Sequence, residues 1–287
     1  MAPDEAVDQA DAWRRMLALA RSPTSPAADL PGTGLDMTPR GGDLFPEAAD
    51  LPSSCSWNPA ARRLLELYLP LCQGCPERFV VAHLGQSLDG RIAAANGASR
   101  WVTGAEDIVH NHRMRALFDA VVVGAGTVRH DDPQLTVRAV PGPHPARVVL
   151  DTQRRLGPDH RLFTDGIAPT LLLCAEALVR PGERLGQAEV LGVTAEDGSL
   201  SPRAVLDQLA GRGLKRVFVE GGGVTVSRFL AAGCLHRLQI TVAPLIIGSG
   251  RASITLPEIE QLSAGLRPEV RRYDLGADVL FDCRLDG

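Results

Sequence analysis

The sequence has no hydrophobic run that approaches the roughly 18 residues of a membrane-spanning helix. Residues 1–10 contain acidic side chains and no basic one, so we expect no secretory signal peptide and a cytoplasmic protein. Basic residues are not in excess either. The net charge of −4 argues against a general nucleic-acid binder. We therefore expect no membrane and no nucleic-acid partner, and any cationic site must be local.

Cysteines are few, and their spacing does not suit a metal centre. Of six cysteines, only Cys72 and Cys75 have the spacing of metal ligands, and one such pair cannot complete a tetrahedral zinc site. No His-x-Glu accompanies the pair, so the signature of zinc deaminases is missing. We therefore expect no bound metal, and reduced, unpaired thiols.

The first quarter of the chain differs in composition from the rest. The 287 residues can form one large domain or two modest ones. Six prolines interrupt residues 23–52, which is typical of an extension rather than a core. Helical spacing of apolar residues predicts short helices over 8–21 and 59–71. We expect residues 1–76 to form a proline-rich extension with one or two helices, and residues 77–287 to form the main domain.

From residue 79 onward, short apolar strands alternate with helical patterns. This alternation predicts an α/β fold with a mainly parallel sheet, helices on both faces and right-handed crossovers. No long helix separates the last strands, so we expect an antiparallel C-terminal end. The expected strands are 79–82, 119–123, 148–150, 170–173, 190–193, 216–219, 238–242 and 279–281, with 245–247 continuing the apolar run, and the expected helices are 103–118 and 201–210.

Two glycine turns follow apolar strands. One contains Gly124 and Gly126, and the other contains Gly221, Gly222 and Gly223. Glycine lets a ligand approach the backbone closely, and the free N–H groups at the start of the following helix favour an anion. A tight strand-to-helix connection with no ligand is the alternative for either turn alone. Together the turns predict one extended phosphate-bearing ligand across the strand ends of the sheet.

Several motifs occur together in the main domain. They are Ser87-Leu88-Asp89-Gly90-Arg91-Ile92-Ala93, Ser99-Arg100-Trp101-Val102-Thr103-Gly104, His112-Arg113-Met114-Arg115-Ala116, Gly124-Ala125-Gly126-Thr127-Val128, Asp131-Asp132-Pro133-Gln134-Leu135-Thr136-Val137-Arg138 and Glu220-Gly221-Gly222. Over residues 79–284 this set resembles the pyrimidine reductase domain of the bifunctional riboflavin-biosynthesis deaminase/reductase, the RibD C-terminal family. The resemblance implies a dihydrofolate-reductase-like fold. It does not extend to the family's deaminase domain, so we expect a stand-alone reductase in residues 77–287.

The resemblance implies NADPH as the hydride donor and a 5-amino-6-ribosylamino-pyrimidine 5′-phosphate as the acceptor. The ribose would be reduced at C1′ to a ribityl chain. Residues at the family's substrate-binding positions are Ser99, Arg115, Leu135, Arg138 and Glu220. Residues at its cofactor positions are Gly85, Trp101, Thr127, Asp131, Thr152, Gly222, Gly223, Val224, Thr225, Val226, Ser227 and Arg228, to which the first glycine turn adds Gly124 and Gly126.

Each of the main polar candidates also has a simpler interpretation. Arg115 and Arg138 are either two forks around a substrate phosphate or solvated surface charges. Asp131 either contacts a cofactor hydroxyl or only belongs to a turn. Glu220 is either an acid at a helix N-terminus or an acceptor for the pyrimidine or ribose.

The proton donor is the least defined part of the predicted site. His83 and Asp89 are the catalytic candidates, and bound water is an alternative. His83 stands where the family commonly has a lysine, and a lone histidine in an apolar strand is often a core residue. This departure leaves a different pyrimidine substrate open. His110 and His112 are expected on a helix surface.

The sequence leaves other functions and assemblies open. The alternatives are a dihydrofolate-reductase-like enzyme acting on another pterin or pyrimidine, and a non-catalytic nucleotide-binding protein. The residues do not distinguish a uracil from a diaminopyrimidine substrate. We expect a homodimer in which the apolar segments 238–247 and 279–281 pair across a two-fold axis. A monomer whose helix 59–71 covers that surface is the alternative.

Overall fold

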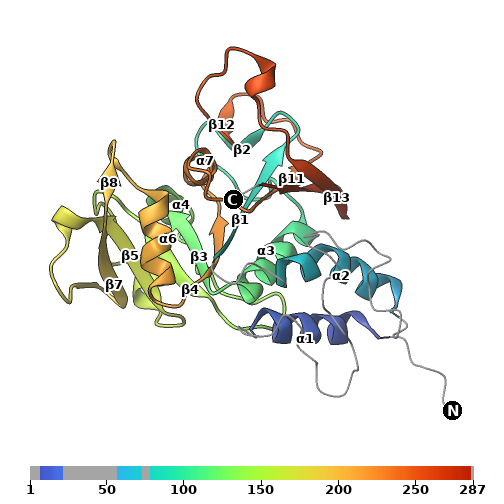
Figure 1. The fold of residues 1–287 in the computed structure, drawn as a ribbon, viewed down its shortest axis with the longest axis horizontal. Coiled ribbons are helices and arrows are strands. Elements are labelled where there is room, and N and C mark those ends of the chain that lie inside the picture. Colours follow the sequence, from blue (N-terminus) through green and yellow to red (C-terminus); the bar gives the residue numbers. More distant parts are fainter. Residues whose placement is uncertain (1–6, 22–56, 73–77, 286–287) are drawn as a thin grey trace. The chain divides into compact units, whose positions relative to one another are not determined.

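The computed structural model describes residues 7–21, 57–72 and 78–285 (Figure 1). They belong to two compact units, Met1–Glu77 and Arg78–Gly287. Within these described residues, none of the helices has both the length and the apolar character that crossing a membrane requires. Cys55 and Cys75 lie outside the described residues. The four cysteines inside them are buried and make no disulfide.

The first unit contains two helices, α1 (Gln9–Ala20) and α2 (Pro59–Cys72), as the apolar spacing predicted. Asp8 caps α1, because its side chain accepts a hydrogen bond of 2.8 Å from the backbone N–H of Asp11. The helices pack together through Trp13 and Tyr68, whose rings meet edge to face with centroids 5.9 Å apart. Both side chains are buried.

The second unit is built on a ten-stranded sheet in the order β13-β14-β11-β1-β10-β3-β4-β5-β7-β6 (Figure 1). The seven strands from β11 to β7 are parallel, whereas β14, β13 and β6 are antiparallel to their neighbours. The strands are β1 (Phe79–Ser87), β3 (Ala120–Gly124), β4 (Ala146–Leu150), β5 (Thr170–Ala175), β6 (Arg184–Leu185), β7 (Ala188–Val193), β10 (Arg216–Glu220), β11 (Arg237–Ala243), β13 (Glu269–Leu275) and β14 (Asp278–Arg284). The central strands are apolar on both sides because both faces of the sheet are covered.

Helices cover both faces, so the predicted fold class is confirmed. On one face, Val205 of α6 and Phe229 of α7 pack with Val80 and Ala82 of β1 in a single core. On the other face, Phe118 stacks on the ring of Phe79. The helices of this unit are α3 (Ala105–Leu117), α4 (Ala125–Asp131), α5 (Arg161–Thr164), α6 (Pro202–Ala210) and α7 (Gly223–Ala231), with short 3-10 turns at Glu176–Leu178 and Leu262–Ala264. Two small sheets pair β2 (Arg91–Ala94) with β12 (Gly250–Ala252) and β8 (Ala195–Glu196) with β9 (Ser199–Leu200).

Two expectations about the C-terminal end of the sheet are wrong. The segment 245–247 is not a strand, and Ile246 is 73% exposed. In addition, β11 and β14 are interior strands, so they cannot offer an open edge to a second copy. The edge is β13, which the sequence analysis missed because its sequence, Glu-Val-Arg-Arg-Tyr-Asp-Leu, is mostly polar. Charged residues are typical of a protected edge strand.

Candidate active site

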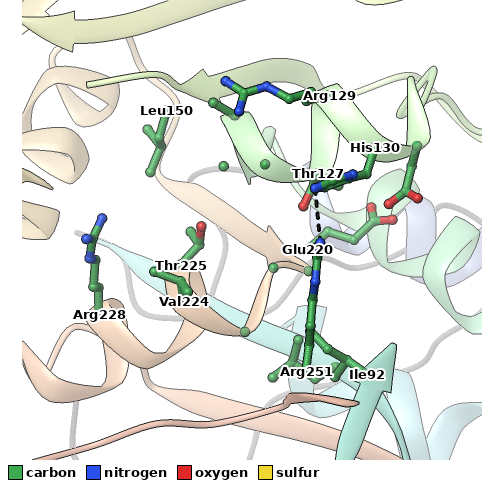
Figure 2. A pocket seen from close by; sticks show the side chains of 18 of the residues that line it. Ile92, Thr127, Arg129, His130, Leu150, Glu220, Val224, Thr225, Arg228 and Arg251 are labelled. Atoms are coloured by element: carbon green, nitrogen blue, oxygen red, sulfur yellow. Dashed lines mark hydrogen bonds between the residues drawn. The ribbon is translucent and has the colours of Figure 1, made fainter. Parts of the chain in front are cut away.

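A cavity of about 890 Å³ opens at the carboxyl ends of the parallel strands. Residues from the middle of β1 and from the ends of β3, β4 and β10 line it, together with residues from the β2–β12 pair (Figure 2). Ligands of open α/β sheets bind at this edge, because the connecting loops and helix N-termini gather there. The location is therefore the one that the two glycine turns predicted.

The first glycine turn leads from β3 into α4. A side chain at Gly126 would meet nothing within 4 Å, so the protein itself leaves this position open toward the cavity. A Cβ at Gly124 would lie 2.5 Å from the hydroxyl of Thr225, which belongs to α7. The two glycine turns are thus direct neighbours, and one ligand can contact both.

The second glycine turn leads from β10 into α7. Gly221 and Gly222 have φ values of +75° and +73°, in the region that favours glycine. A Cβ at Gly223 would collide with the backbone oxygen atoms of Ser253 and Ala252. Gly222 caps α7 without a side-chain hydrogen bond, so the N-terminal N–H groups of this helix are directed at the cavity region rather than at a capping side chain.

Cationic side chains surround the glycine turns. Arg129, Arg155, Arg228 and Arg251 line the cavity, as does His130. Nη2 of Arg251 lies 3.2 Å from Nε2 of His130, so β12 and α4 meet across the cavity (Figure 2). The sequence analysis named only Arg228 of this group. Arg129 and Arg155 follow predicted cofactor residues by two and three positions, which is the signal that could have found them.

Glu220 and Arg115 form a bidentate ion pair at the end of β10. Nε of Arg115 donates to Oε2 of Glu220 at 2.6 Å, and Nη2 donates to Oε1. Nη1 donates to the backbone oxygen of Thr136 at 2.9 Å. The Arg115 and Glu220 side chains are 10% and 17% exposed. Arg115 is therefore mainly the partner of Glu220, and it does not line the cavity, whereas Glu220 does.

Arg138 and Leu135 belong to the loop that Arg115 holds. Nη1 of Arg138 donates to the hydroxyl of Thr136, and the side chain is exposed. Partial burial and the positive charge of Arg115 lower the pKa of Arg138 from its ordinary value. Leu135 is buried with a φ of +53°, and the buried Arg147 accommodates this strained loop by donating to the oxygen of Gln134 at 3.3 Å. Neither Arg138 nor Leu135 lines the cavity.

His83 lies at the floor of the cavity and is 3% exposed. Its Nε2 atom is 3.1 Å from Oδ1 of Asp107 and 3.0 Å from the hydroxyl of Thr241. Burial lowers the pKa of His83, but the Asp107 carboxylate more than offsets this, so the net pKa is raised above its ordinary value. His83 is thus neither a lone core histidine nor an isolated catalyst, because its imidazole is paired with the Asp107 carboxylate.

Asp89 does not reach the cavity, and its geometry argues against a role as proton donor. Its carboxylate accepts hydrogen bonds from the Ser87 hydroxyl at 2.5 Å and from the N–H groups of Ile247 and Gly248 at 3.1 and 2.6 Å. These bonds, that of Ser87 foremost, lower the pKa of Asp89 to about 2. An ionised carboxylate has no proton to give, so Asp89 holds the 247–248 loop instead.

The expectation that His110 and His112 lie on a helix surface is wrong. Both are buried, with 0% and 6% exposure. Burial, assisted by the charge of His83, lowers the pKa of His110 to about 3, and burial with the charge of Arg115 lowers that of His112 to about 4. Nδ1 of His112 accepts the backbone N–H of Arg138 at 3.0 Å, so this histidine also supports the loop that contains Leu135 and Arg138.

The structure brings most of the predicted site residues together. Those lining the cavity are His83, Gly85, Ser99, Gly124, Gly126, Thr127, Asp131, Thr152, Glu220, Gly222, Gly223, Val224, Thr225 and Arg228. Those outside its lining are Asp89, Trp101, Arg115, Leu135, Arg138, Val226 and Ser227. Trp101 is 78% exposed, Val226 is buried in the core, and the hydroxyl of Ser227 accepts the N–H of Thr255 at 2.8 Å. Ser99 donates to Asp131 at 3.3 Å.

Fold and cavity define an α/β protein with a polar, arginine-lined cavity at the strand ends. The chain belongs to the RibD C-terminal domain family, whose model matches residues 78–277. It is 35% identical over 220 residues to the 2,5-diamino-6-ribosylamino-4(3H)-pyrimidinone 5′-phosphate reductase of Methanothermobacter thermautotrophicus, covering 73% of this chain and 99% of that one. The family resemblance found in the sequence is therefore confirmed.

Two further matches cover only about half of the relative's own length. The riboflavin biosynthesis protein RibD of Bacillus amyloliquefaciens is 35% identical over 172 residues, which are 59% of this chain and 46% of the relative. A crystal structure of a diaminohydroxyphosphoribosylaminopyrimidine deaminase/5-amino-6-(5-phosphoribosylamino)uracil reductase from Thermotoga maritima matches with a TM-score of 0.62 and 28% identity, over 73% of this chain and 57% of that chain. This chain spans about half of such RibD proteins.

Proposed function

We propose that the protein is an NADPH-dependent reductase of riboflavin biosynthesis. Its substrate would be a 5-amino-6-(5-phosphoribosylamino)pyrimidine, whose ribose it reduces to the ribityl form. The observation that carries the proposal is the meeting of the two glycine turns at Thr225, inside a cavity whose floor holds His83. The relative from Methanothermobacter, which matches over nearly its whole length, has a name that describes the same chemistry.

The cofactor would be held by backbone and arginines. The N-terminus of α7 and the open position at Gly126 suit its phosphates, since both offer close approach to the backbone. Arg129, Arg155 and Arg228 line the same cavity, and this density of positive charge favours NADPH, with its additional phosphate, over NADH. When bound, NADPH would supply the hydride.

The substrate phosphate would bind near Arg138. This guanidinium is exposed, and it lies close enough to Arg115 for the two charges to interact. A phosphate dianion would relieve that repulsion, and Ser99, which lines the cavity, would add a neutral donor. Glu220, oriented by Arg115, would then accept hydrogen bonds from the ribose or the pyrimidine.

Reduction of the ribose at C1′ also requires a proton. When the C1′–O4′ bond breaks, O4′ takes the electron pair and must be protonated. His83 is the acid in the cavity whose pKa is raised, so it is our candidate for the donor. Asp89 is not, for the reasons given above.

The function is tested by mixing the full chain with NADPH and the phosphoribosylaminopyrimidine, in uracil and diaminopyrimidine forms, and following nicotinamide absorbance. Turnover of either form supports the proposal and shows which base is used. Turnover of dihydrofolate alone would favour another pterin or pyrimidine reductase. Cofactor binding without turnover on any of these compounds would favour a non-catalytic nucleotide-binding protein. A cytoplasmic location remains a prediction.

We propose two further features of organisation. Residues 77–287 are the reductase domain and residues 1–76 an extension, so a chain starting at residue 77 should retain turnover. The protein is a homodimer, now by way of the exposed apolar side chains of Ile246, Leu262 and Leu266 rather than through strand pairing. Light scattering at micromolar concentration tests the dimer, since a single species at 30.6 kDa would contradict it.

A further inference from the structure

We infer that Asp107 is a positioning residue that, with Thr241, fixes the imidazole of His83 at the cavity floor and keeps it charged for proton donation. This inference rests on the proposed reductase function for the identity of the proton acceptor. Neither Asp107 nor Thr241 belongs to the motifs that carried the family resemblance. The arrangement follows from contacts among β1, α3 and β11.

The contacts leave the Asp107 carboxylate fully engaged. Oδ1 lies 3.1 Å from Nε2 of His83 and accepts the Thr241 hydroxyl at 2.6 Å. Oδ2 accepts the hydroxyl of Thr103 at 2.7 Å. His83, Asp107 and Thr241 are 3%, 2% and 0% exposed. Because both oxygen atoms are bound, the carboxylate cannot rotate away without breaking several buried hydrogen bonds.

Gly85 shows that the local packing is adapted to this arrangement. A Cβ at this position would lie 2.7 Å from Cγ2 of Thr103 and 3.3 Å from Oδ2 of Asp107. Glycine at the cavity side of β1 therefore leaves the space in which Thr103 reaches Asp107. This provides a structural reason for a glycine that the family resemblance assigned to the cofactor.

The charges around His83 place the proton on His83 itself. Asp107, His110 and Asn111 face it from α3, Glu220 from β10, and Thr241 from β11. The His110 ring is 5.1 Å from that of His83, and its Nε2 bonds to Gln239 at 2.9 Å. With a pKa of about 3, His110 is neutral.

The other groups leave Asp107 as the principal counter-charge. Glu220 is neutralised by Arg115. A buried carboxylate without a cation is costly, so Asp107 requires a positive His83.

The geometry identifies which nitrogen of the His83 ring would donate the proton to the substrate. Since Nε2 is directed at Asp107 and Thr241, we assign the transferred proton to Nδ1, the other ring nitrogen. In the step, the Nδ1–H bond breaks and an O4′–H bond forms, while the C1′–O4′ electron pair moves to O4′. NADPH, when bound, would supply the hydride for the new C1′–H bond. His83 is left neutral and regains its proton from solvent, so atoms and charge balance.

The first test compares Asp107→Asn with Asp278→Asn. Asp278 is an equally buried carboxylate that accepts the N–H of Gly104 at 2.6 Å, at the start of the same helix but outside the cavity lining. We expect Asp107→Asn to move the basic limb of kcat/KM down by about one to three pH units. We expect kcat to fall while the KM for NADPH stays within about twofold. Asp278→Asn should leave the limb in place. Equal shifts in both variants, or none in Asp107→Asn, would overturn the inference.

A second test needs neither substrate nor a folded variant of Asp107. In the wild-type protein, the imidazole of His83 is followed by NMR between pH 5 and 9, with its signal assigned by its loss in His83→Gln. Titration above the ordinary value of about 6.5 supports the inference, and titration at or below it overturns the inference. Because this readout is independent of turnover, failure of the proposed function and failure of the positioning role are distinguishable.

Discussion

The two glycine turns look alike in the sequence but meet different demands in the structure. In the second turn, Gly221 and Gly222 have positive φ, and a Cβ at Gly223 would collide with backbone oxygens, so the fold alone requires glycine. In the first turn, a side chain at Gly126 would meet empty space, and the fold does not require glycine there. The comparison teaches that an unexplained glycine beside a cavity points to a ligand more directly than a strained one.

Arg115 and Arg138 show the same contrast among charges. Arg115 is almost buried, and its guanidinium donates hydrogen bonds to Glu220 and Thr136. Arg138, in contrast, is exposed. The first arginine therefore belongs to the framework of the site, and the second is available to an anion. The family resemblance implied that both arginines bind the substrate. The geometry instead gives Arg115 a structural role and leaves Arg138 to contact a ligand.

Arg115→Ala should have the largest effect on stability. Removal of the guanidinium leaves the Glu220 carboxylate in a largely buried position without its cation, which costs about 3 kcal/mol or more of unfolding free energy. Urea denaturation measures this change. Arg138→Ala is the matched control and should cost less than about 0.5 kcal/mol. Equal stability losses in the two variants would remove the distinction between framework and ligand arginine.

Gly223→Ala should cause the second-largest loss of stability. The added methyl group would press on the backbone oxygens of Ser253 and Ala252, which are not the ends of flexible side chains. Overpacking of this kind costs about 1–3 kcal/mol. Thermal or urea denaturation without any ligand should show the loss. A fully stable Gly223→Ala protein would mean that the β12 segment moves aside easily.

Arg138→Ala should affect the substrate and not the fold. A charge-assisted contact to a phosphate contributes about 1.5–3 kcal/mol, so the KM for a phosphorylated substrate should rise roughly tenfold or more. The KM for NADPH should change little. A dephosphorylated substrate should already be poor and should lose little more from the mutation, since both changes remove one interaction. Damage to NADPH binding instead would reverse the assignment of the two ligands.

Gly126→Val should have the smallest effect on the fold and a selective effect on the cofactor. Nothing in the protein opposes the side chain, so stability should change by less than about 1 kcal/mol. A branched side chain where backbone meets ligand should weaken NADPH binding by about 1 kcal/mol, roughly fivefold. Fluorescence titration gives the dissociation constant, with Gly126→Ala as a milder control. Unchanged affinity would exclude this turn from the site.

The sequence predicted the fold well where burial leaves a strong pattern. Central strands such as β3 and β10 are continuous apolar runs because helices cover both faces. The edge strands β13 and β6 were missed, since one is mostly polar and the other has two residues. An edge strand faces solvent on one side of its ladder, so its composition resembles that of a loop.

The site could be predicted only in part, for a similar reason. His83, in the middle of β1, pairs in register with Glu220 at the end of the adjacent parallel strand β10, so strand pairing alone brings them together. Thr241 and Asp107 are 134 positions apart, and no local sequence pattern predicts the hydrogen bond between them. A signal did exist: Asp107 and His110 are three positions apart on one face of α3, and Thr103 lies four positions before Asp107, just ahead of the helix. The expectation from the sequence was instead that His110 and His112 lie on a helix surface.

By itself the sequence determined the α/β class, the two glycine turns at strand ends and the family of the protein. These properties depend on residues close together in the chain or on motifs read in order. Only the tertiary structure decided three roles. Arg115 forms an ion pair with Glu220, Asp89 accepts hydrogen bonds from the 247–248 loop, and Asp107 keeps the His83 imidazole positively charged. Such roles depend on which side chains are buried together, because burial and a neighbouring charge set protonation and availability, and neither is a property of local sequence.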